Sequence, residues 1–205
     1  MTPELLAEIQ RTLTLKYDGT DSLHEQKKRS EILAYAQKYG CRIFVETGTN
    51  RGDTVEAVRE FFDDVYSIEI GPTIYEAAQR RFAGIENVHL FLGDARNVLP
   101  TLLLTLPPGK AIFYSDAHCQ YDDASPAGKA EGTSIPEDIR TIQRFRPDSV
   151  IIIDDARLCQ PVPDGSPCNV SGAWPGLLEM LTEIESQGVW DVDLKNDMIR
   201  LVPKS

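Results

Sequence analysis

Short apolar runs alternate with segments of helical length and periodicity along most of this 205-residue chain. The runs that predict strands are residues 42–45, 65–68, 88–92, 111–114 and 150–153. The intervening segments that predict helices are residues 54–62, 72–82, 96–104 and 135–145. Strands that are apolar throughout and separated by helices indicate a parallel sheet covered by helices on both faces. The alternation therefore predicts a doubly wound α/β fold.

The last part of the chain departs from this alternation. Residues 190–194 and 198–203 predict two strands joined by the polar turn Lys195-Asn196-Asp197. We expect this hairpin to add antiparallel strands to the parallel ones. The result is a mostly parallel, seven-stranded, Rossmann-like sheet that ends in an antiparallel hairpin.

The first forty residues predict helices without any catalytic pattern. Pro3 suits a first helical turn, and residues 24–39 form a second helical segment that ends at Gly40. We expect residues 1–40 to be a helical cap, which covers the ligand-binding edge or forms a homodimer contact. Residues 41–205 are then the main domain.

Charge and apolar content limit the partners of this protein. The net charge of −11 gives little cationic surface for phosphates, so we expect no nucleic acid but a small-molecule substrate. The one basic cluster, Lys27-Lys28-Arg29, is explained best as a solvated helix face.

The apolar runs are too short to span a bilayer, and residues 1–4 do not resemble a signal peptide, so a cytoplasmic location is expected. The four cysteines show no zinc-ligand spacing.

Two long stretches interrupt the regular elements. Residues 119–134 and 157–174 both follow the carboxyl ends of predicted strands. Ligands of open α/β sheets bind at that edge, and long loops in compact domains are usually functional. We expect both stretches to form a lid over a ligand.

A glycine-containing turn follows the first predicted strand. Gly48 and Gly52 let the backbone approach a ligand at the start of the next helix. A dinucleotide fingerprint would have a third glycine near Asn50. Asparagine tolerates a left-handed backbone, so the turn remains feasible with Asn50.

Acidic residues end the first three predicted strands. Glu69 lies about twenty residues after the glycine turn, where a carboxylate can accept from ribose hydroxyls. Asp94, within Gly93-Asp94-Ala95, could accept from an adenine amino group. Glu46 beside the turn repels phosphates, which disfavours NAD and ATP. It favours a cofactor that carries an ammonium and a sulfonium.

Together these positions resemble the successive motifs of class I S-adenosylmethionine-dependent methyltransferases, over roughly residues 41–203. The resemblance implies that Glu46 and the turn hold the methionine part, Glu69 the ribose and Asp94 the adenine. The cofactor contacts expected from these motifs are Glu46, Thr47, Gly48, Thr49, Asn50, Gly52, Asp53, Thr54, Glu69, Ile70, Gly93, Asp94, Ala95 and Asp116.

The segments after the fourth and fifth predicted strands are similar to those of a sparsely characterised group of bacterial methyltransferase-like proteins. The motifs are Asp116-Ala117-His118, Ser134-Ile135-Pro136, and Ile153-Asp154-Asp155-Ala156-Arg157-Leu158. The substrates of that group do not carry over to this chain.

The resemblance implies methyl transfer to a small hydroxylated molecule, most simply O-methylation. The candidate catalytic residues are His118, as general base, and Asp116. His118 could instead order the lid by hydrogen bonding. Alternatively Asp116, Asp154 and Asp155 bind a divalent cation such as Mg²⁺, or Asp155 pairs with Arg157. Two other functions stay open: S-adenosylmethionine binding without methyl transfer, and a nucleotide-sugar or NAD-dependent enzyme.

Overall fold

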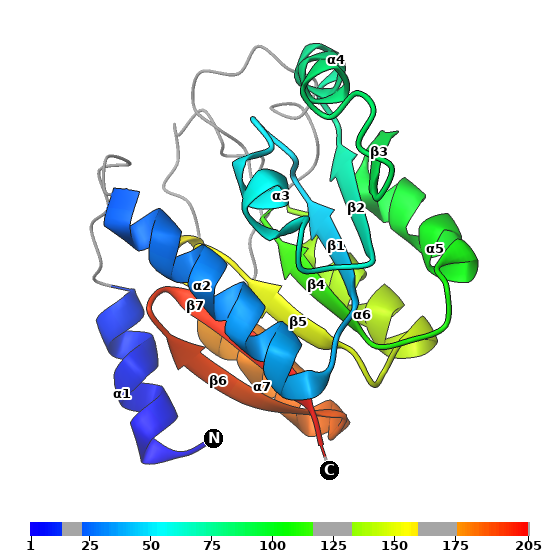
Figure 1. Cartoon of the computed structure of the whole chain (residues 1–205). Coiled ribbons are helices and arrows are strands. Elements are labelled where there is room, and N and C mark those ends of the chain that lie inside the picture. The colour runs from blue at the N-terminus through cyan, green and yellow to red at the C-terminus, as the bar shows by residue number, and fades with distance from the viewer. Residues whose placement is uncertain (14–21, 117–132, 160–175, 205) are drawn as a thin grey trace.

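The computed structural model describes residues 1–13, 22–116, 133–159 and 176–204. These residues form a seven-stranded sheet with the strand order β3-β2-β1-β4-β5-β7-β6 (Figure 1). The first five strands in sequence are parallel, and β7 pairs antiparallel with both β5 and β6. The predicted fold class, including the closing hairpin, is confirmed. The strands are β1 (Ile43–Thr47), β2 (Asp64–Glu69), β3 (Val88–Leu92), β4 (Ala111–Ser115), β5 (Val150–Ile153), β6 (Trp190–Lys195) and β7 (Met198–Pro203).

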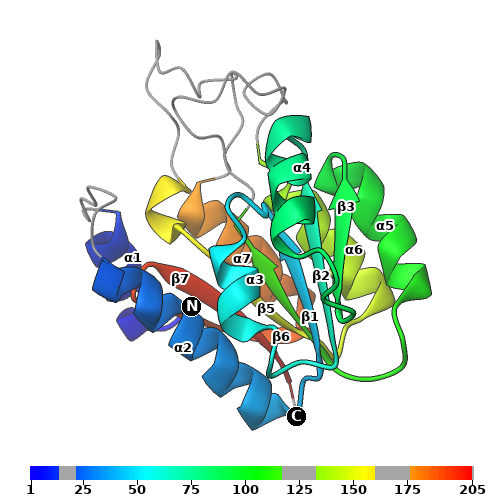
Figure 2. The same ribbon diagram turned by 45° about the horizontal axis from the view of Figure 1, so that its top comes forward.

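Helices cover both faces of the sheet (Figure 2). Alternate residues of each central strand point to opposite faces, so Phe44 and Val45 of β1 belong to two different apolar clusters. One face is covered by α2 (Ser22–Tyr39), α3 (Asp53–Val58) and α4 (Pro72–Arg81). The other is covered by α1 (Pro3–Thr12), α5 (Ala95–Thr105), α6 (Ile135–Phe145) and α7 (Leu177–Gln187). Burial on both faces explains why every residue of β5 is apolar.

Helix α7 lies in a stretch for which the sequence pattern was not interpreted. Its buried residues Leu177, Met180, Leu181 and Ile184 recur at helical spacing. They pack into the same cluster as α5 and α6. The helix ends at Gly188, whose φ of 71° is the left-handed conformation that commonly terminates helices.

Helix α2 packs into the core of the molecule. Ile32 and Ala36 are fully buried against the sheet, and Lys28, one turn earlier on the same face, is only 4% exposed. The prediction of a solvated face for the Lys27-Lys28-Arg29 cluster is therefore wrong for Lys28. A helical cap formed by residues 1–40, and its role at a homodimer contact, stay predictions.

The closing hairpin, formed by β6 and β7, contacts one side of α2. Glu31 of α2 accepts a hydrogen bond of 2.7 Å from the Asn196 amide and forms an ion pair with the buried guanidinium of Arg200. The ring of Tyr35 lies 5.7 Å from that guanidinium. Burial lowers the pKa of Arg200 to about 10.

No helix among the described residues has the length and apolar character needed to cross a bilayer.

Candidate functional site

The carboxyl ends of the central strands are joined into one continuous edge by backbone hydrogen bonds. The N–H groups of Gly48 and Gly93 donate to the carbonyls of Ile68 and Glu69, at 2.9 and 2.8 Å. Similarly, Asp116 and Asp154, the first residues after β4 and β5, each donate to the neighbouring strand at 3.0 Å. The predicted site residues of five strands therefore lie along one edge of the sheet, as parallel strand order requires.

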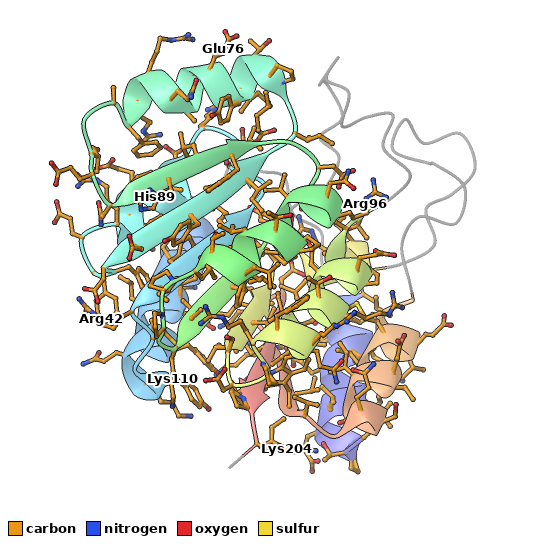
Figure 3. All side chains as sticks on the ribbon, turned by 90° about the vertical axis from the view of Figure 1, so that its right-hand side faces the viewer. Arg42, Glu76, His89, Arg96, Lys110 and Lys204 are labelled. Atoms are coloured by element: carbon orange, nitrogen blue, oxygen red, sulfur yellow. The ribbon has the colours of Figure 1, made fainter. Side chains whose placement is uncertain are left out.

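Figure 3 shows this edge from the side of α5. Arg96, which follows β3, lies at the carboxyl edge. Arg42 and Lys110, which precede β1 and β4, lie toward the opposite edge. Arg42 and Lys110 therefore lie away from the predicted site residues.

The glycine turn between β1 and α3 uses three left-handed residues. Gly48, Asn50 and Gly52 have φ values of 95°, 48° and 79°. Asn50 thus adopts the conformation that the sequence analysis requires of it. At Gly52 a Cβ atom would lie only 2.6 Å from the ring of Phe82, so the position excludes a side chain both by conformation and by space. Helix α3 begins directly afterwards, at Asp53.

Glu69, the last residue of β2, braces this turn. Its Oε2 accepts from the Asn50 N–H at 2.9 Å, and its Oε1 accepts from the Gly71 N–H at 2.7 Å. Glu69 is 7% exposed. Each carboxylate oxygen can accept more than one hydrogen bond. Glu69 can therefore fix the loop geometry and still accept from the hydroxyls of a ligand.

Glu46 is a buried carboxylate on β1. Ser67, its partner in the register with β2, donates a hydrogen bond of 2.6 Å to Glu46 Oε2. Burial raises the pKa of Glu46 well above its usual value, and the charges of Asp116 and Glu69 raise it further. The Ser67 hydrogen bond and the positive charge of Arg29 oppose this rise. A ligand cation placed here would offset the cost of burying the charge.

Asp94 is held at the start of α5. Its Oδ1 accepts from the Arg96 N–H at 2.9 Å, and its Oδ2 lies 2.7 Å from Arg96 Nη2. Hydrogen bonds from Arg96 lower the pKa of Asp94. The proposed adenine acceptor is thus a helix cap and an ion-pair partner, and any adenine amino group would share it with Arg96. Arg96 was not among the residues predicted for the site.

A buried ionic cluster follows β5. The Lys28 ammonium lies 2.8 Å from Asp154 Oδ2 and 3.0 Å from Asp155 Oδ1. The Tyr114 hydroxyl also donates to Asp154. Burial raises the pKa of Asp154, the charges of Asp116 and Asp155 raise it further, and Lys28 opposes the rise. Arg157 lies 2.7 Å from Asp155 Oδ1, so Lys28 and Arg157 neutralise the carboxylates after β5.

This cluster differs from the predicted divalent-cation site. Within the described ranges, no group of three or more His, Cys, Asp or Glu residues is arranged to hold a metal ion. The ammonium of Lys28 contacts both Asp154 and Asp155, where the prediction placed Mg²⁺. The pairing of Asp155 with Arg157, the alternative given from the sequence, is present. Arg157 also binds Asp197, which the sequence analysis assigned only to a turn.

Lys28 is the main site residue that sequence reasoning missed, although a signal was available. Lys28, Ile32 and Ala36 recur at i, i+4 and i+8, which places the lysine on the apolar face of α2. A cation at such a position requires a buried anionic partner. Adjacent aspartates after a buried strand were the matching candidates.

His118 and the greater part of both predicted lid stretches lie outside the described residues. His89 is on the sheet, where its Nε2 lies 3.0 Å from Asp64 Oδ1 and its ring stacks on Tyr66 at 4.8 Å.

No protein-family model matches the chain, and a search of curated proteins finds no relative. Solved structures do share its fold. The chain is similar to the methyltransferase PaMTH1 of Podospora anserina, bound to S-adenosylhomocysteine, with 17% identity, TM-score 0.62, and coverage of 100% of this chain and 89% of that one. It is also similar to the O-methyltransferase TomG of Streptomyces achromogenes, involved in tomaymycin synthesis and solved with S-adenosylmethionine, with 16% identity, TM-score 0.61, and coverage of 100% and 91%.

A third similar structure is an O-methyltransferase of Bacillus cereus in complex with S-adenosylhomocysteine. It has 12% identity and a TM-score of 0.61, and the match covers 98% of this chain and 92% of that one. At these identities the likeness shows the fold, which is the Rossmann-like methyltransferase fold.

Proposed function

We propose that this protein is an S-adenosylmethionine-dependent methyltransferase that acts on a small hydroxylated molecule, by O-methylation. The observation that carries the proposal is Glu46, a buried carboxylate at the carboxyl edge beside a glycine turn. Such a site suits a ligand with a positive charge and repels pyrophosphate. The similar structures solved with S-adenosylmethionine or S-adenosylhomocysteine support this choice of ligand.

The residues present fit this cofactor. Glu46 would accept from the ammonium group of the methionine part, and the turn from Gly48 to Gly52 would let the backbone approach it. Glu69 would accept from the ribose hydroxyls, while Asp94 would accept from adenine. When bound, S-adenosylmethionine supplies a methyl group attached to a positively charged sulfur.

Methyl transfer is an in-line displacement, so the chain must mainly position the acceptor and receive its proton. We assign the proton to His118, because a neutral imidazole can accept it near physiological pH. Asp116, which begins the segment leading to His118, is half-buried at the same edge. The net charge of −11 favours a small acceptor over a nucleic acid.

The alternative is that a divalent cation, rather than His118, activates the acceptor hydroxyl. For Asp154 and Asp155 to bind a cation, Lys28 would have to leave both carboxylates. The His118 assignment predicts full turnover in EDTA and loss of turnover in His118→Ala. Turnover that stops in EDTA and returns with Mg²⁺ would favour the cation instead.

The proposed function is tested in two steps. Calorimetry with S-adenosylmethionine, S-adenosylhomocysteine and NAD should detect binding of the first two only. Transfer of a radiolabelled methyl group should then be screened against catechols, flavonoids and sugars. Binding of NAD alone would contradict the proposal. Binding of S-adenosylmethionine without transfer to any acceptor would favour a binding protein that performs no methylation.

A further inference from the structure

Helix α2 has one side that is fixed by the closing hairpin. Glu31 and Tyr35 lie one turn apart on this side, and both contact Arg200 of β7. In the sheet, β7 lies beyond β5, whereas β1 lies on the other side of β4. The side of α2 that carries Glu31 and Tyr35 therefore faces away from β1.

Arg29 lies on the opposite side of the same helix. Successive residues of an α-helix are rotated by about 100°, so Arg29 and Leu33 project away from Glu31 and Tyr35. Leu33 packs against the apolar cluster that contains Val58 of α3. Helix α3 contacts α2 and lies on the side of α2 that is turned away from β7 (Figure 1). The side of α2 that carries Arg29 therefore faces the β1–α3 connection, which is the glycine turn.

The contacts of Lys28, the residue before Arg29, show where Arg29 lies along the axis of α2. Lys28 reaches Asp154 and Asp155 directly after β5, which places this turn of α2 at the carboxyl edge. Arg29 is half-buried there. In agreement with this position, its positive charge is among the groups that oppose the burial-induced rise in the pKa of Glu46.

A carboxylate and a guanidinium thus approach the glycine turn from two elements, β1 and α2. The methionine part of S-adenosylmethionine ends in an ammonium and a carboxylate on one carbon atom, which needs one acceptor and one cationic donor. We propose that Arg29 binds the carboxylate of this amino-acid end while Glu46 binds its ammonium group. The inference rests on the proposed function, and it adds helix α2 to the cofactor site.

The geometry of arginine suits this role. A guanidinium offers parallel N–H donors that match a carboxylate, whereas lysine offers a point charge. Arg29 would also make binding selective for ligands that carry this carboxylate, because a ligand without it would form one interaction fewer with the guanidinium.

The test compares three ligands by calorimetry: S-adenosylmethionine, its decarboxylated form, and 5′-methylthioadenosine, which lacks the whole amino-acid end. Arg29→Gln should weaken binding of S-adenosylmethionine by about tenfold or more, as expected for a charge-assisted hydrogen bond. It should leave the affinities for the other two ligands within about twofold. Glu46→Gln should weaken both ammonium-carrying ligands but not 5′-methylthioadenosine.

Lys27→Gln is the matched control, because Lys27 carries the same charge on α2 but is exposed. It should leave all three affinities unchanged, and thermal unfolding should show that every variant is folded. Arg29→Gln that binds S-adenosylmethionine like the wild type would overturn the inference. Equal losses for all three ligands would also overturn it, by indicating a structural role. A wild-type protein that binds none of them would contradict the proposed function itself.

Discussion

The ammonium nitrogen of Lys28 lies 2.8 Å from Oδ2 of Asp154, and this ion pair joins helix α2 to the end of β5. Both side chains are buried. Removing one partner of a buried ion pair leaves an uncompensated buried charge, which lowers the free energy of unfolding by more than the loss of an ion pair at the surface.

We therefore expect Lys28→Met to lower the free energy of unfolding by about 3–5 kcal/mol. Urea denaturation at pH 7 measures this change. Lys27→Met, at the exposed neighbouring position, should shift the free energy of unfolding by about 0.5 kcal/mol or less. Equal stabilities of the two variants would mean that the Lys28 ion pairs contribute nothing.

Glu69 should matter for cofactor binding as well as for the glycine turn. Glu69→Ala removes the acceptor of the Asn50 and Gly71 N–H groups and the proposed ribose ligand. Binding of S-adenosylmethionine should weaken by about tenfold or more, since hydrogen bonds to charged groups contribute about 1.5–3 kcal/mol. Calorimetry measures it, with Glu76→Ala on the exposed surface of α4 as control (Figure 3). Unchanged affinity in folded Glu69→Ala would remove Glu69 from the site.

Two glycines with nearly equal φ angles should respond differently to substitution by alanine. Gly52 and Gly84 have φ values of 79° and 81°. An added Cβ would meet the Phe82 ring at Gly52 but nothing within 4 Å at Gly84. Gly84→Ala should cost about 1–2 kcal/mol from backbone strain alone.

Gly52→Ala should cost about 1–3 kcal/mol more than Gly84→Ala because of overpacking. Thermal unfolding of the two variants measures the difference. Gly52→Ala combined with Phe82→Leu should recover part of the extra loss. Identical losses for the two alanine variants would show that the ring yields without cost.

Asp138 should make stability depend on pH. Burial raises its pKa to about 7, and within the described residues its Oδ1 has no hydrogen-bond partner. The ordinary value is 3.8, so the folded state favours the protonated form. Below about pH 4 the Asp138 carboxyl group is protonated in both the folded and the unfolded state, and its contribution to the free energy of unfolding is complete. That contribution is lost as the pH rises to about 7, because the unfolded state releases the proton more readily than the folded state does.

Asp138→Asn removes this titration. Relative to the wild type, the variant should gain a few kcal/mol in free energy of unfolding between pH 5 and pH 8. Urea denaturation of both proteins at the two pH values measures the gain. A constant difference between the two proteins across this range would contradict the raised pKa.

The sequence predicted the sheet well because its strands are buried on both faces. Val150–Ile153 of β5 is apolar at every position, as expected of a central strand that is covered by helices on both faces. The positions of Glu69, Asp94 and Asp154 at one edge followed from the same argument, since parallel strands share an edge. The hairpin was predicted from its polar turn at residues 195–197.

The partners of these residues could not be predicted in the same way. Local patterns place Asp154 after a strand, but they do not say which helix lies above it. The pairing of Lys28 with Asp155 joins residues 127 positions apart, and the pairing of Arg157 with Asp197 joins residues 40 positions apart. Both depend on how α2 and the hairpin pack around β5. Consequently the sequence left a metal ion and the pairing with Arg157 as alternatives for these aspartates, and it did not predict their contact with Lys28.

The attachment of Glu31 to the closing hairpin has a consequence for the order of folding. Its partners Asn196 and Arg200 lie 165 and 169 residues further along the chain. A ribosome adds about 5–20 residues per second, so α2 leaves it well before the hairpin exists. Contacts this distant in sequence form late, because closing the long loop between them costs entropy first. A nascent chain would therefore position Arg29 beside the glycine turn only in the last stage of folding, and it would reach its full affinity for the proposed cofactor only then.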